Sequence, residues 1–205
     1  MKPWDLYSHI WSAEYNESGF DIDWKVEVDS EEKKVRLLFK PSDSDKDWLV
    51  NILGFLPVFK RPLFYTMGWK IAFDSVKLLI FEELLREINL HKGYGVEICG
   101  HSYGGAMSID AGIELYRKAG IKADVITFGA PKPLFLLWSR FYARHCLNTV
   151  TQYRHKSDCI TYLPPFIGYH NIKSDWLEKF SLKNLFKPWI YHAIYNDREI
   201  YGDKE

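Results

Sequence analysis

The chain has 205 residues, which is enough for one domain with a substantial core. Its 27 Lys and Arg residues balance its 27 Asp and Glu residues, so bulk charge favours neither nucleic acid nor an anionic membrane as a partner. Aromatic residues make up 17% of the chain, a share typical of a large core and of apolar pocket walls. We therefore expect a single domain over residues 1–205.

The ends of the chain and its cysteines predict where the protein resides. No basic segment followed by an apolar stretch opens the sequence, and no run of 18 or more apolar residues occurs in it. Cys99, Cys146 and Cys159 lie in or beside apolar runs, which predicts buried, reduced thiols. These features favour a cytoplasmic protein. They do not fix its oligomeric state.

The order of the predicted elements indicates the fold class. The first half of the chain predicts an amphipathic helix over 2–14, a β-hairpin of 20–28 and 34–39 around a charged turn at 29–33, and an irregular apolar segment over 48–65. A long helix over 68–89 follows, and the apolar residues on one of its faces are Ile71, Val76, Leu79, Ile80, Leu84, Leu85 and Ile88. The rest of the chain predicts a strand over 94–99, a helix to about 119, a strand over 123–128, a helix over 134–143 and a strand over 147–154. Strands that alternate with helices predict an α/β fold with a mostly parallel central sheet and helices on both faces.

A Gly-x-Ser-x-Gly pentapeptide connects the strand at 94–99 to the next helix. It runs from Gly100 to Gly104, with Ser102 at its apex. This arrangement is typical of a nucleophile elbow, which needs small residues two positions before and after the serine because a Cβ there would collide with a neighbouring element. The turn exposes the hydroxyl and directs the backbone N–H of Tyr103 at an incoming oxyanion from a helix N-terminus.

A nucleophilic serine needs a base and a carboxylate that orients it. In this fold class the chain order is Ser, then Asp or Glu, then His, with the acid on a loop after a later strand. Asp158 follows the strand at 147–154, and two histidines, His170 and His192, lie downstream of it. The order of residues alone leaves both histidines open as the base.

Several blocks of sequence, in the right order between Val35 and Tyr195, resemble the class 3 or fungal-type lipase family of α/β hydrolases. The blocks are Phe39-Lys40-Pro41-Ser42 with Asp47-Trp48, Met67-Gly68-Trp69, Gly100-His101-Ser102-Tyr103-Gly104-Gly105-Ala106, Thr127-Phe128-Gly129-Ala130-Pro131-Lys132-Pro133, and Ser157-Asp158 with Leu163-Pro164-Pro165. The third block differs from the family's Gly-His-Ser-Leu-Gly-Gly-Ala only at Tyr103. The resemblance implies an α/β-hydrolase fold and a Ser-Asp-His triad.

The resemblance also assigns the histidines. Tyr191-His192-Ala193-Ile194-Tyr195 is similar to the family's Asp-His-x-x-Tyr, with Tyr191 in place of the Asp, and implies that His192 is the base. Gly168-Tyr169-His170 is similar to a family segment that supports the acid loop, which implies a structural role for His170. His101, inside the elbow, is expected to be packed beneath the turn.

The same resemblance implies an oxyanion hole made by Ser42 and by the backbone N–H of Tyr103. Lys40-Pro41 replaces the family's Arg-Gly, and proline lacks an N–H and restricts φ, which bears on the loop before Ser42. No cofactor is implied. His9, His91, His145 and His155 show no ligand spacing, so no metal is proposed, and Asp110 and Glu114 are interpreted as solvated or paired charges.

The function predicted from these features is hydrolysis of carboxylic esters of acyl lipids, as by a lipase or esterase, through an acyl-enzyme on Ser102. The expected partners are a lipid or small-molecule ester and, transiently, a lipid interface. The segment 48–65 is either core beneath a long loop or a flap or wall for an apolar substrate. Two alternatives stay open, a thioesterase or amidase with the same triad and a catalytically idle scaffold used for binding.

Overall fold

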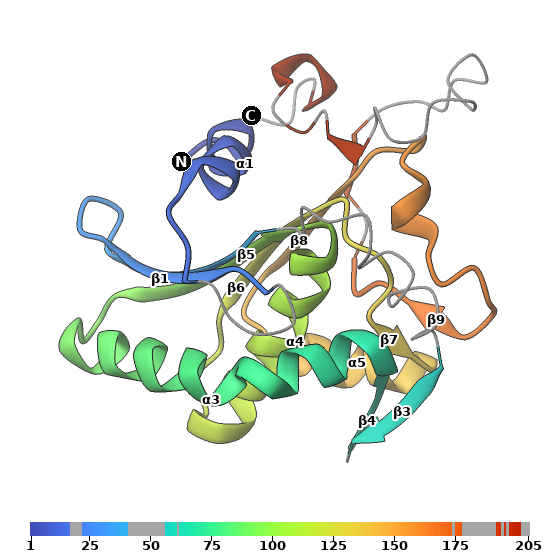
Figure 1. Ribbon diagram of the computed structural model, residues 1–205, viewed down its shortest axis with the longest axis horizontal. Helices are drawn as coiled ribbons and strands as arrows, with labels where there is room; N and C mark the ends of the chain where they lie inside the picture. Colours follow the sequence, from blue (N-terminus) through green and yellow to red (C-terminus); the bar gives the residue numbers. More distant parts are fainter. Residues whose placement is uncertain are drawn as a thin grey trace.

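A six-stranded sheet forms the centre of the structure (Figure 1). The computed structural model describes residues 1–16, 22–40, 56–60, 62–173, 175–177, 192–193, 195 and 197–201. The strands, in spatial order, are β1 (Trp24–Asp29), β2 (Lys34–Phe39), β5 (Gly95–His101), β6 (Asp124–Phe128), β8 (Val150–Arg154) and β10 (Asp175–Trp176). Only β1 and β2 pair antiparallel; every other neighbouring pair is parallel. The predicted hairpin and the predicted mostly parallel sheet are confirmed.

Helices cover the two faces of this sheet. On one face lies α1 (Pro3–Ser12); α3 (Met67–Leu90), α4 (Ser102–Ala119) and α5 (Leu137–Cys146) lie on the other (Figure 1). Successive residues of the central strands serve opposite cores, because Leu37 packs with α3 and α4 whereas Leu38 packs with α1. Such strands read as continuous apolar runs because both of their faces are buried. Of the helices in the described ranges, none combines the length and the apolar character needed to cross a membrane.

A second, smaller antiparallel sheet lies beside the first and corrects two sequence predictions. It contains β3 (Pro57–Lys60), β4 (Leu63–Thr66), β7 (Leu134–Phe135) and β9 (Tyr169–His170). The described end of the segment 48–65 is therefore a regular hairpin rather than an irregular path, and residues 48–55 lie outside the described residues. The helix predicted over 134–143 begins only at Leu137, because Leu134 and Phe135 pair with β4 and β9.

The long helix α3 matches its predicted span, but its inner face was partly wrong. Ile71 and Leu79 are more than half exposed, at 53% and 57%. The buried side instead carries Phe73, Val76, Ile80, Phe81 and Leu84. Helical periodicity alone could not choose between two partly apolar faces of this helix, because aromatic residues lie on one of them and aliphatic residues on both.

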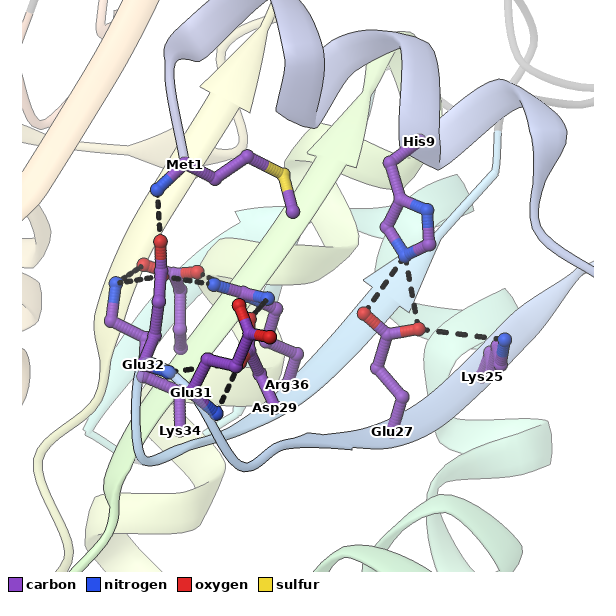
Figure 2. A network of polar contacts seen from close by, with 10 residues as sticks. Met1, His9, Lys25, Glu27, Asp29, Glu31, Glu32, Lys34 and Arg36 are labelled. Atoms are coloured by element: carbon purple, nitrogen blue, oxygen red, sulfur yellow. Dashed lines mark hydrogen bonds and ion pairs between the residues drawn. The ribbon is translucent and has the colours of Figure 1, made fainter.

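The first helix is attached to the β1–β2 hairpin by polar contacts as well as by its apolar side. Figure 2 shows His9 of α1 pointing at Glu27 of β1, at 2.9 Å, and the amino group of Met1 at Glu32. Arg36, which is only 1% exposed, donates to Glu97 at 2.7 Å, to Asp29 at 2.5 Å and to Glu32. With Lys34 bound to Glu97 at 2.6 Å, the positive and negative charges of the cluster around Arg36 balance. The buried pair of Arg36 and Glu97 within this cluster is tolerated because both charges are paired and hydrogen-bonded.

Candidate active site

The strand β5 runs directly into α4 through a sharp turn at Ser102. Ser102 has a φ of 54°, one of three non-glycine residues with positive φ in the described chain. An L-residue in that region is strained, and strain of this sort is stored at functional sites when the surroundings enforce it. Here the close approach of β5 and α4 enforces the positive φ of Ser102, and the neighbouring glycines allow that approach because they have no side chains.

The glycines on either side of Ser102 leave no room for a Cβ. A Cβ on Gly100 would lie 2.4 Å from the carbonyl oxygen of Gly104, and one on Gly104 would lie 2.7 Å from that of Phe39 on β2. Gly105 is equally confined, with the Cβ of Ala130 at 2.8 Å. The sequence expectation that small residues are needed at these places is therefore confirmed. The elbow is pressed against β2 and against the loop after β6.

Asp158 and His192 meet next to this elbow, although they are distant in sequence. The Nδ1 of His192 lies 2.9 Å from Oδ2 of Asp158, a carboxylate with no exposed surface. Because a carboxylate only accepts, Nδ1 carries the proton, and this fixes the tautomer of the ring. Gly129, with a φ of 59°, lies against the pair: a Cβ there would be 2.8 Å from Oδ2 of Asp158 and 3.0 Å from Nδ1 of His192.

Two further donors hold the Asp158 carboxylate. The hydroxyl of Tyr195 donates to Oδ2 at 2.8 Å, and the backbone N–H of Ile160 donates to Oδ1 at 3.0 Å, which caps the 3-10 helix η1 (Cys159–Tyr162). The Tyr195 hydroxyl in turn accepts from the backbone N–H of His155 at 3.1 Å. The main chain of Tyr195 is fixed as well, since the Tyr201 hydroxyl donates to its carbonyl at 2.7 Å. Burial raises the pKa of the Tyr195 hydroxyl well above its usual value, so the group stays a donor.

His101 supports the segment that carries His192. Its side chain is 2% exposed, and its Nε2 donates to the backbone carbonyl of His192 at 2.7 Å, with the two rings 4.5 Å apart. Burial, and next the nearby His192, hold the pKa of His101 well below its usual range, so the ring is neutral. Tyr7 and Trp11 of α1 cover it from the other side, with ring centroids at 5.1 and 5.5 Å. His101 is thus packed beneath the turn, as the sequence analysis expects.

The other residues predicted for the site are Tyr103, Ser42 and His170. Tyr103 is in the first turn of α4, directly after Ser102. Ser42 lies outside the described residues. His170 is in β9 of the second sheet, paired in register with Leu134, and burial together with the charges of Arg140 and Lys132 lowers its pKa. Within the described part of the chain, no three histidine, cysteine or acidic side chains gather as metal ligands would.

Two residue assignments from sequence need correction. Cys159 is exposed rather than buried, because it opens the turn after Asp158; Cys99 and Cys146 are buried as expected. Asp110, interpreted together with Glu114 as a solvated or paired charge, is not solvated but only 2% exposed on α4, whereas Glu114 is paired with Arg117 at 2.5 Å. The signal for the burial of Asp110 is its place among apolar residues at 104–115 of a helix that is buried on nearly every side. The signal for the second donor to Asp158 is the position of Tyr195, three residues after His192.

A mostly parallel sheet with helices on both faces, entered by a serine elbow at the end of β5, defines an α/β-hydrolase fold. Residues 36–168 match the model of the lipase (class 3) family, and the chain belongs to that family. This accounts for the resemblance of the sequence blocks described above.

Individual relatives agree with this membership. The chain is 26% identical over 156 residues to a lipase of Rhizomucor miehei, covering 71% of this chain and 42% of that protein. The solved structure of the Rhizomucor miehei triacylglyceride lipase superposes with a TM-score of 0.72 at 22% identity, over 80% of this chain and 65% of that one. A triacylglycerol lipase with a serine protease triad as its catalytic centre gives 0.73 at 22% identity, over 81% and 66%. The chain thus spans about two fifths of the first curated relative it matches.

Proposed function

We propose that this protein is a serine ester hydrolase in which Ser102 is the nucleophile, His192 the base and Asp158 the acid. The observation that carries the proposal is the bond between His192 and the buried Asp158 beside a strained serine elbow. A histidine whose Nδ1–H is held by a carboxylate presents its other nitrogen, Nε2, as a proton acceptor. Membership in the lipase (class 3) family supports the reaction class.

The chemistry follows from these roles. His192 takes the proton of the Ser102 hydroxyl as its oxygen attacks the ester carbonyl, and Asp158 stabilises the imidazolium that forms. The oxyanion is held by the backbone N–H of Tyr103 at the start of α4, where the helix dipole favours negative charge, and by Ser42. The imidazolium then protonates the departing alcohol, and water attacks the acyl-enzyme with His192 again as base.

An acyl lipid is the proposed substrate class. The described end of the segment 48–65 exposes large apolar side chains, with Leu56 63% and Phe59 49% exposed. The ring of Phe59 lies 4.6 Å from that of Phe64 in a tilted pair, and Phe64 meets the partly exposed Trp138 at 6.4 Å, so the second sheet carries an aromatic edge. Apolar surface of this kind suits an acyl chain or a lipid interface better than a polar ester.

Hydrolysis of p-nitrophenyl esters from acetate to palmitate tests the proposal. Ser102→Ala and His192→Ala are each expected to lower kcat by about a thousandfold or more, because members of a triad act as a unit. His170→Ala is the matched control, since this histidine lies in the second sheet, and it should keep most of the activity. The length of the preferred acyl chain reports the size of the pocket.

Labelling with a fluorophosphonate separates an activated serine from an idle one. The wild type should be labelled and Ser102→Ala should not. A dead His170→Ala together with an active His192→Ala would contradict the assignment of the base. A wild type that neither cleaves esters nor takes the label would overturn the hydrolase proposal in favour of a binding scaffold.

A further inference from the structure

A cavity of about 310 Å³ lies where α3, α4 and the end of β3 meet, away from the serine elbow. Its walls are formed entirely by charged side chains: Lys60, Lys70, Asp74, Lys77, Glu114 and Arg117. Glu114 comes 12 residues after Ser102 in α4, which places this part of the wall about 18 Å along the helix from the elbow. The cavity is thus distinct from the candidate active site.

Positive charge exceeds negative charge around this cavity. Four of the six lining side chains are cationic and two are carboxylates, so the formal net charge is +2. Three lysines converge on one carboxylate: Lys70 and Lys77 each lie 2.8 Å from Oδ1 of Asp74, and Lys60 lies 3.8 Å from Oδ2. Burial alone would raise the pKa of Asp74, but the hydrogen bonds from Lys70 and Lys77 outweigh it and lower that pKa. Asp74 is therefore ionised, and it offsets only one of the lysines.

One of the side chains that line the cavity, Lys70, is a buried cation. Lys70 is 1% exposed, and its ammonium lies 5.1 Å from the ring centroids of both Tyr65 and Phe73. Burial of an ammonium is costly unless charges or ring faces stabilise it. Each ammonium also has three donors, so contact with Asp74 uses only part of its capacity.

Asp110, which lies close to Lys70, does not cancel this charge. Burial raises the pKa of Asp110 to about 8; Lys70 opposes the rise, while Glu114 and Asp74 add to it. The carboxyl is therefore mainly neutral at pH 7. The cavity differs in charge from the cluster around Arg36 in Figure 2, whose positive and negative charges balance, so that this cluster needs no further ion. Among the side chains that line the cavity, Arg117 donates to Glu114 at 2.5 Å and Lys70 lies 3.9 Å from Glu114, so the excess of positive charge is carried by the lysines around Asp74.

We propose that this cavity is a binding site for a phosphate group. A phosphate monoester carries a charge of about −2 at neutral pH and three strong acceptor oxygens, which matches the excess positive charge of the lining side chains and the ammonium donors of Lys60, Lys70 and Lys77. The group can come from a soluble phosphate or from the headgroup of an anionic lipid. Lys60 follows the exposed Phe59 in β3, so the site lies next to the apolar surface of the hairpin. The proposal is independent of the ester hydrolase activity.

Titration calorimetry with inorganic phosphate at pH 7 and low ionic strength tests the site. Lys60 and Lys77 are 52% and 28% exposed, so replacing them should not disturb the core. The double variant Lys60→Gln/Lys77→Gln should bind phosphate at least about tenfold more weakly, because each lost charged hydrogen bond is worth about that factor. Lys92→Gln/Lys173→Gln removes the same charge elsewhere on the surface and should bind as the wild type does.

Co-sedimentation with vesicles identifies the source of the phosphate. Vesicles of phosphatidylcholine alone are compared with vesicles that also contain phosphatidic acid. Loss of binding to phosphatidic acid in the Lys60→Gln/Lys77→Gln variant assigns the site to a lipid headgroup. If phosphate binding depends on these lysines but vesicle binding does not, the site takes a soluble phosphate.

Two results would overturn the proposal. One is no saturable binding of phosphate by the wild type, and the other is equal weakening in the two double variants, which would mean a diffuse surface effect. Hydrolysis of p-nitrophenyl butyrate, which has no phosphate, should be the same in Lys60→Gln/Lys77→Gln as in the wild type. Failure of the phosphate site and failure of the ester hydrolase proposal are therefore distinguishable.

Discussion

Tyr195 is the side chain on which the geometry of the proposed acid and base most depends. Its hydroxyl donates to the same carboxylate oxygen, Oδ2 of Asp158, that accepts from His192, and it accepts from the backbone of His155. One group thus joins the loop after β8 to the segment that carries the base. A tyrosine here acts through Asp158, as a positioning residue.

Tyr195→Phe is expected to lower kcat for ester hydrolysis by about tenfold while leaving KM unchanged, because a hydrogen bond to a charged group is worth about 1.5–3 kcal/mol. The measurement is steady-state hydrolysis of p-nitrophenyl butyrate, with folding checked by circular dichroism. Tyr153→Phe is the control: Tyr153 stacks on Phe128 at 5.3 Å and makes no described contact with Asp158. Equal kcat values in wild type and Tyr195→Phe would show that the other donors suffice.

Among the site residues, the sequence predicted those that belong to local motifs. Ser102 and Asp158 stand in blocks whose spacing signals them, and the order of residues alone could not separate His192 from His170. The contact between His192 and Asp158 spans 34 residues, so it depends on how the C-terminal segment returns to the sheet. The apolar neighbours of Asp110 and the place of Tyr195 after His192 are signals in the sequence, but the partners that these two side chains meet depend on tertiary structure.

The element that controls the site is the junction of β5 with α4. Because the backbone of Gly104 lies against Phe39 of β2, the first turn of α4 can approach the sheet only without a side chain there. The position of the Ser102 hydroxyl and of the Tyr103 N–H both follow from this approach.

Gly104→Ala should therefore displace α4 from β2, since the new Cβ would lie 2.7 Å from the Phe39 carbonyl oxygen and 2.9 Å from its Cβ. We expect destabilisation of about 1–3 kcal/mol, typical of overpacking, together with loss of fluorophosphonate labelling. Gly95→Ala, at the start of β5, is the control, because the nearest atom to its Cβ would be 3.9 Å away. Normal labelling of Gly104→Ala at wild-type stability would contradict the close approach.

Elements with one clear period were predicted well, and elements set by tertiary pairing were not. The span of α3 follows from its helical period, and β1, β2, β5, β6 and β8 follow from their apolar runs, whereas the two-residue strand β10 was not predicted. The two-residue strand β7 exists only because β4 and β9 lie on either side of it, so Leu134 and Phe135 look like the start of α5 in the sequence. The same holds for β3 and β4, whose pairing overrides their irregular composition.

Across the whole molecule, two clusters of charge are buried in different ways. Arg36, Lys34 and the amino group of Met1 are matched by three carboxylates, whereas Lys70 shares the interior of the α3–α4 contact with Asp110, whose Oδ1 has no hydrogen-bond partner among the described residues. A buried carboxyl with an oxygen that accepts no hydrogen bond is tolerated better when it holds its proton. Folding and protonation of Asp110 are therefore coupled.

Asp110→Asn should remove a dependence of stability on pH that the wild type has. The pKa of Asp110 is raised from 3.8 to about 8 in the folded protein, so between these values the folded state binds more protons than the unfolded state. The free energy of unfolding contributed by this group is greatest below 3.8 and falls as pH rises toward 8, by at most about 1.4 kcal/mol for each pH unit. Urea denaturation of both proteins at pH 5 and pH 8 measures it, and the variant should gain relative to the wild type at the higher pH.

Asp74→Asn is the control, because the pKa of Asp74 is shifted down where that of Asp110 is shifted up. Because the hydrogen bonds from Lys70 and Lys77 outweigh burial and lower the pKa of Asp74, its carboxylate is ionised throughout this range, and the stability it contributes is lost only as pH falls below that range. Asp74→Asn should therefore differ from the wild type by nearly the same amount at pH 5 and pH 8, since Asp74 is the smallest of the influences that raise the pKa of Asp110. If Asp110→Asn also differs from the wild type by a constant amount, Asp110 is ionised in the folded protein, and the net charge of the phosphate cavity is one unit lower than inferred.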